Sequence, residues 1–66
     1  MVEGFRKLAD GSYRHLDQNI ELRPAMYGWA VYENGWRKYR YFRLHDAANA
    51  GRAIAFGLAV PDGFIV

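Results

Sequence analysis

The fold of this chain is decided by residues 26–44, MYGWAVYENGWRKYRYFRL. Two runs rich in aromatic and β-branched residues, which favour strands, lie on either side of Asn34-Gly35. Asn-Gly is the preferred pair for a two-residue type I′ turn between antiparallel strands. Residues 26–44 are therefore expected to form a β-hairpin at the centre of the fold.

A two-residue turn also predicts the register of this hairpin and the two faces that it shows. If every residue pairs in strict succession outward from the turn, each residue of the first strand faces one residue of the second. The expected pairs are Glu33 with Trp36, Tyr32 with Arg37, Val31 with Lys38, Ala30 with Tyr39, Trp29 with Arg40, Gly28 with Tyr41, Tyr27 with Phe42, and Met26 with Arg43. Because side chains alternate along a strand, one face would carry Tyr27, Trp29, Val31, Trp36, Lys38, Arg40, Phe42 and Leu44. The other would carry Met26, Gly28, Ala30, Tyr32, Arg37, Tyr39, Tyr41 and Arg43. The first face has the larger apolar cluster, so we expect it to cover the core, with Lys38 and Arg40 extending outward near the turn.

The segments before this hairpin predict shorter strands. Asp10-Gly11 is a good turn signal between residues 5–8 and residues 13–16, which would form a first hairpin. Residues 20–23 are expected to be a brief strand that Pro24 ends or places at a sheet edge.

The segment after the hairpin predicts one helix over about residues 46–60. Asp46 suits the N-cap, and residues 47–59 are rich in alanine and lack proline. An apolar stripe expected to lie on the sheet consists of Ala47, Ala50, Gly51, Ile54 and Leu58. Residues 61–63, Pro-Asp-Gly, end the helix, and residues 64–66 add an edge strand or fold back on the core. The predicted fold is α+β: a small antiparallel sheet of three to five strands, packed on one face by a single C-terminal helix.

Length and composition exclude several classes of protein. The 66 residues allow one small domain, residues 1–66, and no second core. The absence of cysteine excludes disulfides and thiolate zinc sites, and two histidines in different elements do not make a metal site. No phosphate-binding loop or plausible nucleophile is present, so we expect neither an enzyme nor a cofactor. No secretory signal is visible and the longest apolar run, residues 53–60, is far shorter than the roughly 20 residues of a membrane span, which predicts a cytoplasmic protein.

The charges and aromatic residues concentrate in the central hairpin. The net charge is +2, yet residues 34–45 hold four positive charges and no negative one, which leaves 5 − 7 = −2 for the rest of the chain. Seven of the eleven aromatic residues lie between Tyr27 and Phe42. Guanidinium groups bind phosphates or base edges, rings stack on bases, and a β-ribbon can enter the major groove. The pattern therefore favours a nucleic-acid-binding protein, first of all for double-stranded DNA, with the contact residues Arg37, Lys38, Arg40, Arg43, Tyr32, Tyr39 and Tyr41.

A run of the chain resembles a known family. Residues 29–42, WAVYENGWRKYRYF, followed by the alanine-rich residues 47–56, look like the Apetala-two/ethylene-response-factor type of DNA-binding domain, and the related N-terminal domains of tyrosine-recombinase integrases share its plan. The resemblance covers about half of the chain. It implies a three-stranded sheet with a helix, an exposed sheet face laid into the major groove, and Trp29 and Phe42 in the core. With the small size, it suggests a phage, mobile-element or bacterial transcription regulator.

Two alternatives remain open at the level of sequence. The same tyrosine and arginine surface suits a protein-interaction module, such as a small regulator or inhibitor, and it also suits a merely solvated sheet face. Acidic Glu21 or Glu33 within the surface would favour a protein partner, and a continuous positive stripe would favour nucleic acid. Phe56 and Val60, on the outer side of the helix, are a further candidate surface for self-association or a protein partner.

Overall fold

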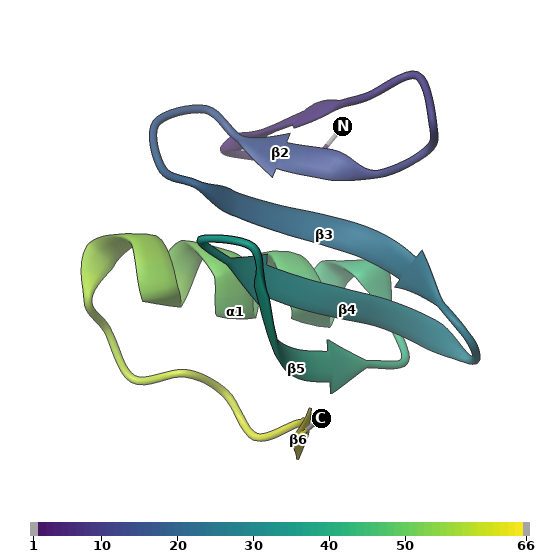
Figure 1. The fold of residues 1–66 in the computed structure, drawn as a ribbon. Helices are drawn as coiled ribbons and strands as arrows, with labels where there is room; N and C mark the ends of the chain where they lie inside the picture. Colours follow the sequence, from purple (N-terminus) through teal and green to yellow (C-terminus); the bar gives the residue numbers. More distant parts are fainter. Residues whose placement is uncertain (1, 66) are drawn as a thin grey trace.

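Each strand of the sheet pairs with the next strand in the chain. The computed structural model describes residues 2–65. Its elements are β1 (Phe5–Lys7), β2 (Tyr13–His15), β3 (Ile20–Ala25), β4 (Gly28–Glu33), β5 (Trp36–Tyr41), α1 (Leu44–Phe56) and β6 (Phe64–Ile65). The strands form one antiparallel sheet in the order β1-β2-β3-β4-β5-β6, and α1 lies across one face of it (Figure 1). The predicted α+β fold is confirmed: β1 to β5 give the sheet five strands, the upper limit of the predicted range, and the two-residue β6 joins its edge.

The turns that the sequence predicts form as expected. Asn34 and Gly35 have φ values of 54° and 83°, as a type I′ turn requires at both of its central residues. In the turn between β1 and β2, a carboxylate oxygen of Asp10 accepts hydrogen bonds from the Ser12 amide at 3.0 Å and from its hydroxyl at 2.6 Å. Both predicted hairpins are therefore present.

Strand β3 is longer than predicted. It continues through Pro24 to Ala25, so of the two expected alternatives Pro24 does not end the strand but lies at an edge of the sheet. Strand β2 pairs with β3 only at Glu21 and Leu22, which leaves Pro24 with a strand partner on the β4 side alone. A proline, which has no amide hydrogen to donate, tolerates this edge position.

The predicted register of the central hairpin is wrong beyond its first two pairs. Glu33 opposes Trp36 and Tyr32 opposes Arg37 as expected, but Val31 then opposes Tyr39, and Lys38 has no partner across the ladder. Lys38 is therefore the extra residue of a β-bulge, which shifts the rest of β5 by one position. The shift turns Tyr39 and Tyr41 toward the helix-covered face and Arg40 toward the open face, the reverse of the prediction.

The exposure of the rings departs from the prediction as well. Trp36 and Phe42, both placed against the core from sequence, are 73% and 65% exposed. Trp29 does pack against the core, and Val31 is fully buried, as expected.

The helix begins and ends earlier than predicted. Arg43 occupies the N-cap position without a side-chain cap, and Asp46 lies in the first turn, so its assignment as the N-cap is wrong. Gly57 ends the helix with a φ of 69°, which leaves Leu58 outside it and 65% exposed rather than in the buried stripe. Small residues do face the sheet as predicted; the buried ones are Ala47, Ala48, Ala50, Gly51 and Ala53. At Gly51 a Cβ atom would stand 2.7 Å from the Phe5 ring, which shows how closely the helix approaches β1.

The core lies between α1 and the middle of the sheet. Leu22 and Val31, on the paired strands β3 and β4, are fully buried, and Phe5, Ile20 and Tyr41 complete the large side chains around them. The segment after the helix returns to the sheet, where the Tyr41 hydroxyl donates a hydrogen bond to the Pro61 carbonyl at 2.8 Å. Of the two alternatives for the C-terminal residues, the edge strand is the one that forms, because β6 pairs with β5; Val66 lies outside the described residues.

Candidate functional site

Two rows of side chains cross the sheet on the face opposite the helix. Residues that oppose one another in antiparallel strands point to the same face. The longer row crosses five strands and consists of Arg6, Arg14, Glu21, Tyr32 and Arg37. Among residues 2–63, whose side chains the structure describes, the shorter row crosses three strands and consists of Arg23, Ala30 and Arg40. We call these eight residues the open face.

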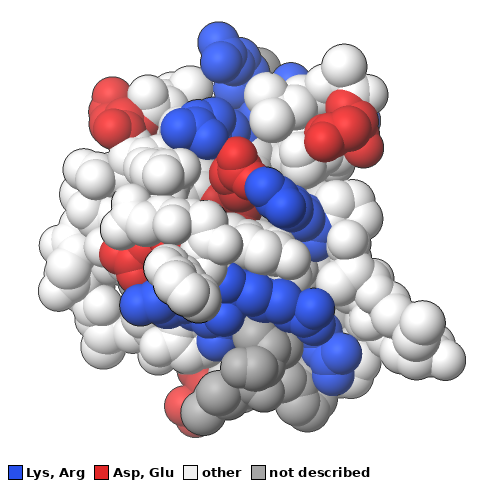
Figure 2. All heavy atoms as spheres, viewed as in Figure 1, with Lys and Arg blue, Asp and Glu red and all other residues white. Residues whose placement is uncertain are grey.

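The open face is basic. It carries five arginines and one carboxylate, a formal charge of 5 − 1 = +4 from the rows just given. Figure 2 views the molecule from this side and shows blue side chains at the top, centre and lower part of this side, with a red group beside the central one and other red groups toward the edges. The net charge of the whole chain is only +2, so the positive charge is concentrated on this side of the molecule.

Glu21 holds two of the arginines in place. Its Oε2 atom is 2.9 Å from Nη1 of Arg14, and its Oε1 atom accepts bonds from Nε and Nη2 of Arg23 at 2.8 and 2.6 Å. The hydrogen bonds to this carboxylate raise the pKa of Arg23 further above its ordinary value. Because Glu21 is the more buried partner in both ion pairs, the guanidinium groups extend from it toward solvent.

Tyr32 takes part in the same cluster. The guanidinium carbon of Arg23 lies 4.5 Å from the centre of the Tyr32 ring, within the range of a cation–π contact. Arg23 is therefore fixed by a carboxylate on one side and a ring on the other, which orders its remaining N–H donors before any ligand arrives.

The seven residues singled out from sequence fall into three groups. Tyr32, Arg37 and Arg40 lie together on the open face. Arg43 is exposed in the segment that joins β5 to α1, and Lys38, on the bulge, forms an ion pair with Glu33 at 3.1 Å. Tyr39 and Tyr41 lie on the helix-covered face, so their predicted place on the open face is wrong; Tyr41 is only 4% exposed. The bulge at Lys38 is the cause of both misplacements.

Three residues of the open face were missed from sequence. Arg6, Arg14 and Arg23 come from strands β1, β2 and β3, which precede the central hairpin. The signal that could have found them is alternation: Arg14 sits between Tyr13 and His15, and Arg23 lies two residues after Glu21, so each has a definable face once its strand is paired.

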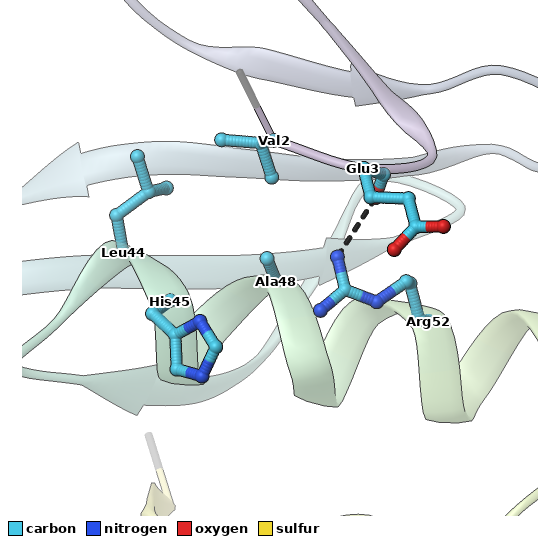
Figure 3. Close-up of a pocket in the computed structure, with 6 residues that line it drawn as sticks. All are labelled: Val2, Glu3, Leu44, His45, Ala48 and Arg52. Atoms are coloured by element: carbon cyan, nitrogen blue, oxygen red, sulfur yellow. Dashed lines mark hydrogen bonds between the residues drawn. The ribbon is translucent and has the colours of Figure 1, made fainter.

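A separate small pocket lies on the helix side, between the N-terminal segment and α1 (Figure 3). Its volume is about 330 Å³, and its lining residues are Val2, Glu3, Leu44, His45, Ala48 and Arg52. The Arg52 guanidinium donates a bond of 2.7 Å to the Glu3 carbonyl and another bond to the Asn49 side chain. The bond to Glu3 ties the chain before β1 to the helix, and none of the seven residues predicted to bind nucleic acid lines the pocket.

Two other kinds of site were tested against the described residues. Among residues 2–65, no group of three or more histidine, cysteine or acidic side chains is placed to hold a metal ion. Within the same range, α1 has 13 residues, and no helix has the length and apolar character needed to cross a membrane.

Comparison with known proteins gives no relative. No family model, curated protein or solved structure matches this chain.

Proposed function

We propose that this protein is a non-enzymatic nucleic-acid-binding protein that takes double-stranded DNA onto the open face of its sheet. The observation that carries the proposal is the gathering of five arginines from four strands on the face opposite the helix. Guanidinium groups bind phosphates with two parallel hydrogen bonds, and neutralised phosphates release counterions, which supplies much of the affinity. A cytoplasmic protein of this kind would meet DNA directly.

The dimensions of the longer row support a duplex. From Arg6 to Arg37 there are four strand spacings, or about 19 Å. The major groove is about 12 Å wide, so arginines at the two ends of the row can reach phosphates on both sides of it. Residues in the middle of the row then face the base edges.

The structure changes the proposed contact set. Arg6, Arg14 and Arg23 join Arg37, Arg40 and Tyr32 in the proposed set, and Arg43 stays in it as an exposed arginine of the segment that follows β5. Tyr39 and Tyr41 are no longer proposed as contacts, because they lie on the other side of the sheet.

The test is a titration of the full chain with a duplex of mixed sequence at several salt concentrations. If three or four arginines neutralise phosphates, log K should fall against log salt with a slope of about −3 to −4. Arg37→Gln should reduce this slope by about 1. Lys7→Gln is the matched control, since Lys7 opposes Tyr13 on the helix-covered side and is also exposed. Binding that does not respond to salt, or equal losses in the two variants, would contradict the proposal.

A protein partner is the second candidate, and Glu21 favours it. This carboxylate lies within the basic rows, and a mixed surface of arginine, tyrosine and glutamate suits a protein interface. Against this, both oxygens of Glu21 are already engaged by Arg14 and Arg23, so the charge presented outward is mainly positive. A protein ligand would show a weaker salt dependence than DNA and would lose affinity when Glu21 is changed.

A further inference from the structure

The turn between β3 and β4 carries an unfavourable backbone conformation. Tyr27 has a φ of 64°, in the left-handed region that glycine and asparagine tolerate and large side chains do not. The other long hairpin of this sheet uses Asn34 and Gly35 at its left-handed positions. A bulky residue here destabilises the turn, so its presence needs a reason.

Packing within the molecule does not supply that reason. Tyr27 is 79% exposed and its neighbour Met26 is 73% exposed. Within residues 2–65, the Tyr27 ring makes no hydrogen bond and no ring contact. Two large apolar side chains are therefore presented to solvent by a strained turn.

The turn lies at one end of the open face. Ala25 and Gly28 are paired on either side of the turn, and the next residues on the same face are Arg23, Ala30 and Arg40. In Figure 1 this end of the β3–β4 hairpin projects beyond the start of α1. Phe42, 65% exposed, belongs to the same end, because its Cα atom would stand 2.9 Å from a Cβ atom at Gly28.

We propose that Met26 and Tyr27 form a wedge that enters between base pairs of the DNA held on the open face. This inference rests on the proposed function, and it adds that the duplex is distorted at the point where the turn meets it. Proteins that bind the minor groove insert apolar side chains between base steps and unstack them, and we expect a wedge beside the major-groove contacts to act on the base stack in the same way. Here the arginine rows supply the cations, and the exposed side chains of Met26 and Tyr27 supply the wedge.

A fluorescent base analogue tests the wedge. The full chain is bound at saturation to duplexes that carry 2-aminopurine at successive central positions, because this analogue brightens when it is unstacked. The wild-type protein should raise the fluorescence severalfold at one step, and it should bind a duplex with a central mismatch about tenfold more tightly than the matched duplex.

Tyr27→Asn is the informative variant, since asparagine tolerates the left-handed conformation. It should abolish most of the fluorescence increase and the preference for the mismatch, while the melting temperature of the free protein rises by about 4–8 °C. Leu58→Asn is the control: Leu58 is also a large exposed apolar residue, at 65%, but it follows the helix. It should behave as wild type in DNA distortion.

The outcomes separate the two proposals. Salt-dependent binding with no fluorescence change in the wild type overturns the wedge and keeps the DNA-binding function. Absence of duplex binding at low salt overturns both. Loss of binding to anionic lipid vesicles in Tyr27→Asn, with DNA distortion unchanged, would assign the turn to a membrane surface and overturn the wedge.

Discussion

Replacing Glu21 by glutamine should tighten DNA binding and destabilise the fold at the same time. The substitution keeps the size of the side chain and removes the one negative charge of the open face, which changes its formal charge from +4 to 5 − 0 = +5. It also releases Arg14 and Arg23 from their ion pairs. The two effects have opposite signs, so they can be measured separately.

The gain in affinity follows from the repulsion that is removed. A phosphate bound on the outer side of either guanidinium would lie about 7 Å from the carboxylate, where two like charges repel by roughly 0.6 to 2.4 kcal/mol, depending on the local dielectric. This corresponds to binding roughly 3- to 60-fold tighter at low salt. If both released arginines neutralise phosphates, the salt slope steepens by about 1 to 2.

The loss of stability follows from the exposure of the pairs. The side chains of Arg14 and Arg23 are 42% and 50% exposed, so each pair is worth only about 0.2–1 kcal/mol. The variant should therefore unfold with a free energy about 0.5–2 kcal/mol below that of the wild type.

Fluorescence anisotropy with a labelled duplex measures the first effect, and thermal unfolding followed by circular dichroism measures the second. Glu33→Gln is the matched control, because Glu33 makes the same kind of ion pair with Lys38 at 3.1 Å and lies outside the arginine rows. Weaker DNA binding by Glu21→Gln, or an equal gain in both variants, would refute the electrostatic reasoning and favour a protein partner that uses Glu21.

Two further predictions concern the fold. Tyr41→Phe should cost about 0.5–1.5 kcal/mol, because it leaves the Pro61 carbonyl without its donor. Burial raises the pKa of the Tyr41 hydroxyl above its ordinary value of 10.0, so the folded protein loses this proton at a higher pH than the unfolded chain does. The free energy of unfolding should therefore fall as the pH rises through about 10 and beyond. Chemical denaturation at several pH values should show a smaller fall in Tyr41→Phe, which has no hydroxyl to ionise. Deletion of Lys38 should leave a folded domain that retains DNA binding, because the pairs on both sides of the bulge then follow in strict alternation. A deletion variant that is unfolded by circular dichroism would show that the bulge is required for the fold.

Local chemistry made much of the fold predictable. Asn34-Gly35 and Asp10-Gly11 fixed two turns, and the small residues Ala47, Ala50 and Gly51 indicated the face of the helix that meets the sheet. The start of the helix was harder to predict, because an aspartate such as Asp46 suits both the N-cap and the first turn of a helix.

The bulge escaped prediction because Lys38 looks like any other strand residue. The sequence nevertheless contained one indication of an irregular register. Strict pairing placed the charged Lys38 and Arg40 on the core side, where desolvation is costly, and placed Tyr39 and Tyr41 on the open side. One extra residue resolves that conflict by placing the tyrosines inside. The full extent of the open face required the pairing of β1, β2 and β3, which no single segment reveals.

The ladder between β2 and β3 is short, so the helix contributes much of what holds the first hairpin in the fold. Only two residue pairs join these strands, whereas six pairs join β3 to β4. Arg6 and Arg14 belong to the first hairpin, β1 and β2, whereas Arg23, Arg37 and Arg40 belong to the longer strands β3 and β5. Phe5 packs in the core against Gly51, and Arg52 donates to the Glu3 carbonyl, so a loss of these helix contacts would move the first two arginines relative to the other three.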